Sequence, residues 1–353
     1  MAATVKTVAA TVKTAVAATV PTAATTTVTM GPLKVAVIGV GNLGAIHADI
    51  YGRMPEVQLA AVVDTDRDRA RAAAARYGCI ALDSAEQLAG ARAAVQVDAV
   101  SIVVPTTAHR AVAEVVLGAG LHALLEKPVA ENVADSCAIV ELAAERGVIL
   151  QIGHLERFNA GVMKLAELAD NPRFIEVHRL DAFAGRATDV DVVADLMIHD
   201  IDIVLSLVRA ELKQVCAAGA RVITEHIDIA NARLEFVGGA VANVTASRVS
   251  RSRFRRIRVF SGCGYLGLNF TDQQLDHVFP APVGRDAKFP KLVERRVAVE
   301  PQLPLNAELA HFVDCVRHGR RPLVAGEDGL IAVQVAQQVR QKISESIADS
   351  IGG

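Results

Sequence analysis

The chain has 353 residues, of which 52% are hydrophobic, and its formal net charge at pH 7 is −2. This length is enough for two domains with a sizeable core, and the small net charge argues against nucleic acid or an anionic membrane as the main partner. No uninterrupted apolar run reaches the roughly 18 residues of a membrane span, so we expect a cytoplasmic protein without a membrane partner.

Residues 1–30 form a low-complexity segment of mainly Ala, Thr and Val, in which Thr-Val-Lys-Thr at 4–7 recurs at 11–14. This composition predicts a disordered tail. The segment lacks the continuous apolar core of a signal peptide and the arginines of a transit peptide. Met30 directly precedes the compact part and is a candidate for the real start, which the gel mobility of the native protein would test.

A glycine-rich turn follows the first predicted strand, 35–38. In the spacing G-x-G-x-x-G, the first glycine permits a tight turn, the second lets the backbone approach a pyrophosphate, and the third lets the next helix pack closely. The helix that begins there would direct its free N–H groups at the phosphates. The predicted cofactor contacts in this turn are Gly39, Gly41, Asn42, Leu43 and Gly44.

The second predicted strand, 59–63, ends in Asp64. This acid lies about 20 residues beyond the glycines, where a carboxylate would bind the adenosine ribose hydroxyls. It would also repel a 2′-phosphate, so the cofactor predicted is NAD, contacted here by Asp64 and Thr65. Arg67 lies close enough to keep NADP as the less favoured alternative.

Strand and helix patterns alternate through the first part of the chain. They predict an α/β fold in which residues 31–153 form an NAD-binding Rossmann domain with a doubly wound parallel sheet. Ligands of such sheets bind beyond the carboxyl ends of the strands. Further cofactor contacts are therefore predicted at Pro105, Thr106, His109, Glu126 and Lys127.

The second part of the chain changes character. Residues 230–236 alternate strictly between apolar and polar, as in a sheet with one wet face, and residues 240–247 run back after Gly238-Gly239. We expect residues 154–323 to form an α/β domain with an open, mostly antiparallel sheet that binds substrate. Its solvent side would make a homo-oligomer, a dimer or a tetramer. Residues 324–353 are predicted to form a C-terminal helix that packs back on the first domain.

Six arginines gather within a short stretch. They are Arg248, Arg251, Arg253, Arg255, Arg256 and Arg258. A solvated strand edge is the interpretation we favour, and a phosphate contact is the alternative.

Asp195, His199 and Asp202 stand at i, i+4 and i+7 and form one polar stripe on an otherwise apolar predicted helix. A carboxylate one turn from an imidazole fixes its tautomer and raises its basicity, as for a general base. The spacing supports an alternative equally well, in which Asp195 belongs to the first turn of the helix and His199 is a core histidine whose nitrogens are hydrogen-bonded within the protein. No third ligand follows at local spacing, so we predict no metal site.

Oxidation of a secondary alcohol by NAD needs a group that takes the hydroxyl proton as the hydride leaves. His199 would supply this base, and Lys127 would polarise the oxygen as a cation. The two side chains would come from two domains that face one cleft.

Three motifs in this order carry a family resemblance. They are Gly39-x-Gly41-x-x-Gly44 with His47, Glu126-Lys127-Pro128, and Asp195-x-x-x-His199. They resemble the Gfo/Idh/MocA oxidoreductases from Lys34 to the last helix. The resemblance implies a Rossmann domain joined to an open-faced α/β domain, catalytic roles for Lys127, Asp195 and His199, and a cis Lys127–Pro128 peptide bond.

Within the family, the segments around 154–159, 178–179 and 195–202 are most similar to the subgroup that oxidises the 3-hydroxyl of UDP-N-acetylglucosamine. This similarity implies a nucleotide-sugar substrate, and a pyridoxal-phosphate aminotransferase downstream that makes a 3-amino sugar for lipid A or related glycans. Arginines would neutralise the pyrophosphate. The substrate contacts so implied are Lys127, Arg157, Asn159, Arg179, Arg186 and His199.

Two alternatives remain at this point. One is an inositol or free-sugar dehydrogenase of the same family, which would not need pyrophosphate-binding arginines. The other is a non-catalytic regulator that binds NAD, against which the set of Lys127, Asp195 and His199 argues. The five scattered cysteines contain no C-x-x-C pair, which indicates a reducing compartment without disulfides or structural zinc.

Overall fold

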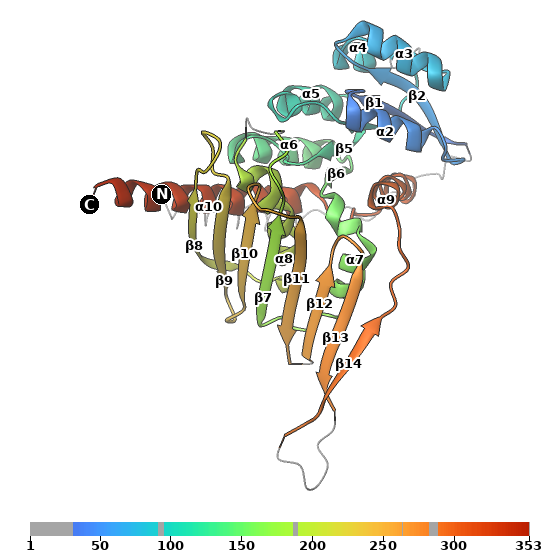
Figure 1. Cartoon of the computed structure of the whole chain (residues 1–353). Coiled ribbons are helices and arrows are strands. Elements are labelled where there is room, and N and C mark those ends of the chain that lie inside the picture. Colours follow the sequence, from blue (N-terminus) through green and yellow to red (C-terminus); the bar gives the residue numbers. More distant parts are fainter. Residues whose placement is uncertain (1–30, 91–94, 186–189, 263, 282–288, 353) are drawn as a thin grey trace.

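The computed structural model describes residues 31–90, 95–185, 190–262, 264–281 and 289–352, so the tail expected at 1–30 lies outside the described residues. Two sheets organise the chain, and a long helix near the C-terminus runs alongside both of them (Figure 1). Within the described ranges, no helix is both long enough and apolar enough to cross a membrane.

The first sheet is parallel and has the strand order β3-β2-β1-β4-β5-β6. Its strands are β1 (Leu33–Ile38), β2 (Val57–Val63), β3 (Ile80–Leu82), β4 (Ala99–Ile102), β5 (His122–Glu126) and β6 (Leu150–Gly153). Its helices are α2 (Asn42–Tyr51), α3 (Arg67–Tyr77), α4 (Ala85–Gly90), α5 (Thr106–Gly118) and α6 (Val133–Arg146). The strand order reverses at β1, which is where ligands of doubly wound sheets bind. The predicted Rossmann architecture is confirmed.

The apolar run of β1 is explained by burial on both of its faces. Ala36 and Ile38 belong to one hydrophobic cluster, whereas Val35 and Val37 belong to a second cluster on the opposite face. Strands buried on both faces read as continuous apolar runs because each side chain meets a layer of helices. This placement fixes the glycine-rich turn at the edge of a rigid core.

The second sheet has eight strands in the order β14-β13-β12-β11-β7-β10-β9-β8, and β7 and β10 make its parallel pair. Its strands are β7 (Phe174–Leu180), β8 (Leu212–Ala220), β9 (Ile229–Phe236), β10 (Val241–Ser247), β11 (Phe254–Ser261), β12 (Gly264–Asn269), β13 (Gln274–Pro280) and β14 (Leu292–Val297). The strict alternation predicted for β9 is present, with Ala232 and Leu234 buried and Asn231 exposed. The open, mostly antiparallel sheet is therefore confirmed.

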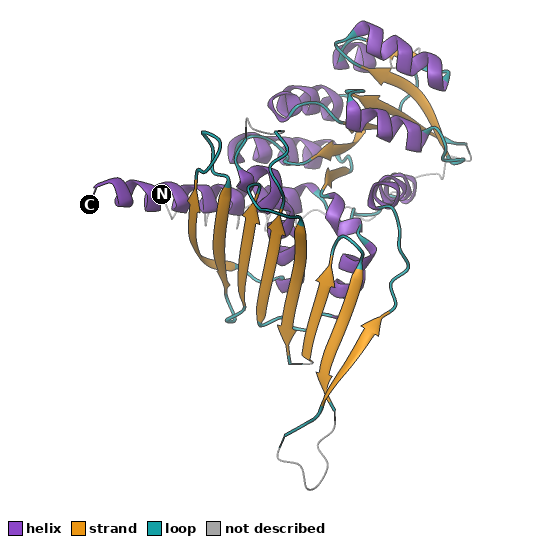
Figure 2. Cartoon of the chain, in the orientation of Figure 1, coloured by secondary structure: helices purple, strands orange, loops and turns teal. Residues whose placement is uncertain are grey.

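Helices cover one face of this sheet (Figure 2). They include η2 (Leu155–Phe158), α7 (Ala160–Leu168), the π-helical turn η3 (Val193–Met197) and α8 (Ile198–Val208). On the opposite face the rings of Phe174 and Phe260 lie 6.1 Å apart, and those of Phe260 and Tyr265 lie 5.1 Å apart. These rings are partly exposed, and the use of this face in a homo-oligomer stays a prediction.

The last two helices connect the domains. The helix α9 (Pro304–His318) contacts α2, and its Leu309, Phe312 and Val313 are buried in the same cluster as Val35 of β1. The helix α10 (Gly326–Gly352) contacts α6 and β6 of the first sheet and also α8 and β8 of the second. The helix α9 also contacts η2 of the second domain, so it lies between the two domains, and the predicted boundary at residue 324 stays a prediction.

Candidate active site

The glycine-rich turn forms a close backbone cradle between β1 and α2. Gly39 has a φ of +85°, and a Cβ there would lie 2.4 Å from the carbonyl oxygen of Val103. A Cβ on Gly44 would lie 1.8 Å from the carbonyl oxygen of Gly39, whereas the space around Gly41 is open. Only glycine fits at positions 39 and 44, and the open space at Gly41 leaves room for a phosphate.

The N-terminus of α2 is suited to anions. In the described structure no side chain caps it, and its first turn, which includes Asn42 and Leu43, carries no acidic residue. Free N–H groups and the helix dipole at such an end attract phosphate. The cradle and this helix end together fit the pyrophosphate of a dinucleotide.

Asp64 lies at the carboxyl end of β2 and is 7% exposed. Its Oδ2 accepts a hydrogen bond from the Val40 amide at 2.9 Å, and its Oδ1 accepts one from the Asp66 amide at 2.9 Å. Arg69 Nη1 lies 3.3 Å from Oδ2. These contacts fix the carboxylate beside the glycine-rich turn, as its predicted role on the ribose requires.

The arginine that lies next to this carboxylate is Arg69 and not Arg67. Arg67 pairs instead with Asp83, with 2.7 Å between the guanidinium nitrogen and the carboxylate oxygen. Sequence reasoning missed Arg69, although its place one turn into a helix capped by Asp66 was a usable signal. Thr65 directly follows Asp64 and is exposed, and its contact with the cofactor stays a prediction.

Asp64→Asn is expected to lower the preference for NAD over NADP by at least about tenfold. The neutral amide would no longer repel a 2′-phosphate, and Arg69 would lose the Asp64 carboxylate but keep that of Asp66, so that its Nη1 becomes available to the phosphate. The ratio of kcat/KM for the two cofactors measures the change. Asp49→Asn on α2 is the control, because Asp49 pairs with Arg53 and Arg76 away from the turn. An unchanged ratio in Asp64→Asn would mean that Asp64 does not face the ribose.

Residues after β4 support the site in different ways. Pro105 precedes α5, and Thr106 is its first residue. His109 is 1% exposed, and its ring nitrogens contact the carbonyl oxygens of Pro128 at 2.9 Å and Val104 at 3.1 Å. A neutral imidazole has one N–H, so His109 donates to one of these two oxygens, and its buried ring lies between the loop after β4 and the loop after β5. Its contact with the cofactor stays a prediction.

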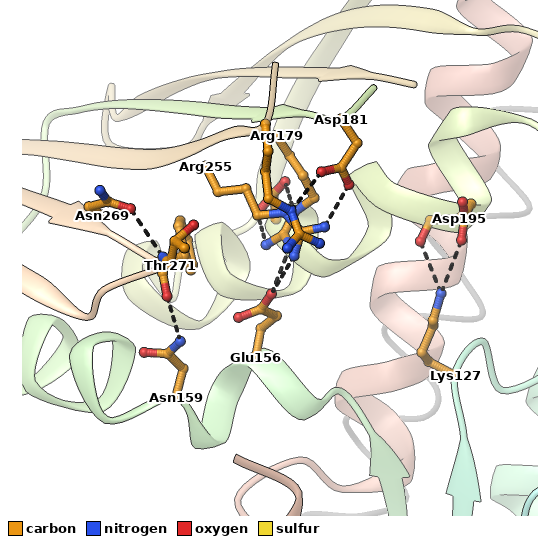
Figure 3. Close-up of polar contacts among 12 residues, drawn as sticks. Lys127, Glu156, Asn159, Arg179, Asp181, Asp195, Arg255, Asn269 and Thr271 are labelled. Atoms are coloured by element: carbon orange, nitrogen blue, oxygen red, sulfur yellow. Dashed lines mark hydrogen bonds and ion pairs between the residues drawn. The ribbon is translucent and has the colours of Figure 1, made fainter. Parts of the chain in front are cut away.

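Lys127 leaves the end of β5 and reaches the second domain. Its Nζ donates to the backbone oxygen of Asp195 at 2.9 Å and lies 3.9 Å from the Asp195 carboxylate (Figure 3). The Lys127–Pro128 peptide bond is cis, as the resemblance implies. Burial lowers the pKa of Lys127 from its usual range, while the Asp195 carboxylate opposes that shift. Glu126 beside it lies 3.4 Å from the buried ring of His47.

The predicted contact between Asp195 and His199 is not formed. Asp195 lies in the π-helical turn η3 and His199 in α8, and the Nδ1 of His199 has no hydrogen-bond partner among the described residues. A π turn bonds i to i+5, so it departs from the α-helical spacing on which the stripe was predicted. Asp195 instead contacts Lys127.

His199 has a second imidazole beside it. His154 lies edge-on to it with ring centroids 6.3 Å apart, and burial lowers the pKa of His154 to about 3. Burial also holds the pKa of His199 well below its usual range, assisted by the charges of Lys127 and Arg179. Both rings are therefore neutral at physiological pH. His154 directly follows β6, so the strand-end rule would have identified it.

Two of the three arginines predicted to bind a pyrophosphate, Arg157 and Arg179, form ion pairs within the protein. Arg179 is buried and donates to both carboxylate oxygens of Asp200 at 2.8 Å and to Glu156 at 2.7 Å (Figure 3). Arg157 lies 3.3 Å from the carboxylate of Asp202. Arg186 lies outside the described residues. These ion pairs leave Arg179 without a free face for substrate.

Asn159 acts as the N-cap of α7. Its Oδ1 accepts a hydrogen bond from the Gly161 amide at 3.0 Å, and its side chain is buried. Its Nδ2 lies 3.5 Å from the backbone oxygen of Phe270. The residue is therefore used to fix the start of a helix, a role that its amide performs without a ligand.

The favoured interpretation of the arginine cluster, a solvated strand edge, is wrong for Arg255, Arg256 and Arg258, which lie in β11, whereas Arg251 and Arg253 are exposed before that strand. The strand β11 pairs with β7 on one side and β12 on the other, so it lies inside the sheet. Its arginines alternate between the two faces. Arg258 meets Glu176 on the open face, whereas Arg255 meets Asp181 on the helix-covered face.

No group of three or more His, Cys, Asp or Glu side chains that could hold a metal ion occurs in the described ranges. The residues that the structure brings together are Lys127, Asp195, His199 and His154, at the carboxyl edge of the first sheet and the adjoining helices of the second domain. They provide a cation, a carboxylate and a neutral imidazole within one neighbourhood. Such a set suits proton transfer from an alcohol.

Comparison with known proteins gives consistent matches along the chain. A model of an oxidoreductase family with an NAD-binding Rossmann fold matches residues 33–154, and a model of the GFO/IDH/MocA C-terminal domain matches residues 169–266. The chain is 37% identical over 313 residues to a UDP-N-acetylglucosamine 3-dehydrogenase from Acidithiobacillus ferrooxidans, which covers 86% of this chain and 97% of that relative.

Two further matches extend the comparison. A myo-inositol 2-dehydrogenase from Thermotoga maritima is 27% identical over 327 residues, which covers 85% of this chain and 93% of that enzyme. A solved structure of a UDP-N-acetylglucosamine 3-dehydrogenase from Acidithiobacillus ferrooxidans superposes with a TM-score of 0.82 at 36% identity, covering 89% of this chain and 98% of that one.

Proposed function

Because this chain belongs to the Gfo/Idh/MocA oxidoreductase family, as its motifs predict, we propose that it oxidises the 3-hydroxyl of UDP-N-acetylglucosamine to the 3-keto sugar. The protein is an NAD-binding oxidoreductase that acts on a CH–OH group. The observation that carries the choice of substrate is the 37% identity over nearly the full length of a relative with this activity.

Three side chains would perform the chemistry. His199 would accept the hydroxyl proton, for which its imidazole is suited because its lowered pKa keeps it unprotonated. Lys127 would donate a hydrogen bond to the same oxygen and stabilise its developing negative charge. Asp195 would hold Lys127 in place through the 2.9 Å contact at its backbone oxygen and through its carboxylate. The glycine-rich turn would hold NAD, whose nicotinamide would supply the acceptor for the hydride of the sugar carbon.

The wider setting follows from the product. A 3-keto sugar is a substrate for transamination, so we propose that a pyridoxal-phosphate aminotransferase acts next and makes a 3-amino sugar for lipid A or a related glycan. We also propose that the enzyme works in the cytoplasm as a homo-oligomer formed through the open sheet face. Size-exclusion chromatography with light scattering would give the oligomeric state.

The first test is the appearance of reduced nicotinamide, followed by absorbance, when purified protein receives NAD and UDP-N-acetylglucosamine. An aminotransferase and glutamate are included to remove the ketone. We expect reduction of NAD with the UDP-sugar and none with free N-acetylglucosamine. Activity with myo-inositol and none with the UDP-sugar would favour the second candidate, an inositol dehydrogenase. The 27% identity to the Thermotoga maritima myo-inositol 2-dehydrogenase supports this candidate.

A further inference from the structure

A cavity lies directly beside the proposed catalytic residues. It has a volume of about 250 Å³, and its lining includes Asp181, Phe183, Asp195, Arg248 and Arg253. Asp195 belongs both to this cavity and to the contact with Lys127. A ligand that fills the cavity would therefore contact Asp195, the residue that positions Lys127.

The cavity offers the two chemical features that a nucleoside diphosphate needs. Arg253 has a half-exposed side chain and uses its Nε in a 3.0 Å contact with Asp181. Its two terminal nitrogens contact no other described residue. A guanidinium binds phosphate oxygens with two such nitrogens. Phe183 is 40% exposed, so its ring is accessible for stacking on a base.

The carboxylates of the cavity do not prevent an anion from binding. Asp181 is shared by two arginines, because Arg255 Nη2 donates to its Oδ2 at 2.6 Å while Arg253 holds its Oδ1. When Arg253 turns toward a ligand, Asp181 keeps Arg255 as its partner. Asp195 is likewise opposed by the Lys127 cation at 3.9 Å. Neither carboxylate would be left with an uncompensated charge.

The arginines on the other side of the site lack this freedom. Arg179 is bound by Asp200 and Glu156, and both it and Asp200 are buried. Moving Arg179 toward a ligand would leave the Asp200 carboxylate charged and buried without its partner, which is costly. In contrast to Arg179, Arg253 can therefore change partners at low cost.

We propose that this cavity is the subsite for the nucleoside diphosphate of the substrate, with Arg253 on the diphosphate and Phe183 against the base. The inference rests on the proposed function, because only a nucleotide-linked sugar would use such a subsite. It assigns to Arg253 the role that the family resemblance implies for Arg157, Arg179 and Arg186.

Titration calorimetry with UDP as the probe tests this subsite. Arg253→Ala is expected to weaken UDP binding by roughly 10- to 100-fold, the range typical of hydrogen bonds to a charged group. The affinity of Arg253→Lys for UDP should lie between those of the wild type and Arg253→Ala, because lysine keeps the charge but loses the paired nitrogens of the guanidinium. The control is Arg296→Ala, which removes an exposed arginine paired with Asp276 at 3.3 Å on the same sheet and should bind UDP like the wild type.

Steady-state kinetics separates binding from folding and from the cofactor site. In Arg253→Ala the KM for UDP-N-acetylglucosamine should rise while the Kd for NAD stays unchanged. If the wild type oxidises UDP-N-acetylglucosamine and binds UDP, but Arg253→Ala matches Arg296→Ala, then the subsite is wrong and the proposed function stands. If the wild type neither binds UDP nor oxidises the UDP-sugar, then the proposed function fails, and the subsite fails with it.

Discussion

His199→Ala is expected to lower kcat by about 10²- to 10⁴-fold, the usual contribution of a general base. The Kd for NAD should not change, because His199 lies in α8 of the second domain, away from the glycine-rich turn of the first. Single-turnover kinetics and fluorescence titration with NAD measure the two quantities. His226→Ala is the control, because His226 is exposed on the loop between β8 and β9.

The pH profile gives an independent reading of the same residue. A base whose folded-state pKa is lowered stays unprotonated, and so active, until the pH falls through that lowered value. Burial holds the pKa of His199 well below 6.5. The acid limb of kcat/KM should therefore lie below pH 6.5 in the wild type and be absent in His199→Ala. An unchanged limb in this variant, or an equal loss of NAD binding, would contradict the assigned role.

Arg179→Ala is expected to lower the free energy of unfolding by about 3–5 kcal/mol, the usual result of removing one partner of a buried ion pair. The Asp200 carboxylate, which is fully buried, would lose both of its hydrogen bonds to the guanidinium. Urea unfolding followed by circular dichroism measures the change. The result would assign Arg179 to the core of the second domain and not to the substrate.

A matched control lies on the neighbouring strand. Arg258 pairs with Glu176 on the open face with a side chain that is 39% exposed, and Arg258→Ala should cost less than about 1 kcal/mol. If Arg179→Ala left stability unchanged and instead raised the KM for the UDP-sugar, then Arg179 would bind the pyrophosphate as the sequence suggests.

The first domain was predictable because its signals are local. The motif lies within about 30 residues and consists of four apolar residues, three glycines at fixed spacing and an acid after the next strand. The glycines reflect what the backbone requires, and the acid reflects the ribose contact. Gly39 and Gly44 meet backbone oxygens that no side chain could approach. The short strand β3 has only three residues and carries too little pattern to be recognised.

The second domain was predictable in kind but not in strand order. The alternation in β9 reveals one wet face, yet nothing local to β11 indicates that β7, about 75 residues earlier, lies beside it. The sequence interpretation therefore placed the arginines of β11 at an edge. The partners in ion pairs could not be predicted for the same reason, because Arg179 lies in β7 and Asp200 in α8.

The proposed catalytic residues were predicted as a set, but their contacts with one another were not. Motif spacing identified Lys127, Asp195 and His199, and the structure places Asp195 against Lys127. The π-helical turn that contains Asp195 has no signature in a single sequence, because it differs from an α-helix by one inserted residue. Which cation a carboxylate meets depends on such local geometry.

The packing of α9 has a consequence for synthesis. The cluster around Val35 and Tyr51 is completed by Leu309, Phe312 and Val313 of α9. At about 5–20 residues per second, a ribosome needs on the order of ten seconds to make the roughly 150 residues that separate β6 from α9. During this interval the nascent chain exposes an apolar surface of the kind that chaperones bind. The cofactor domain is therefore complete only after α9 has emerged, although its sheet is among the first parts made.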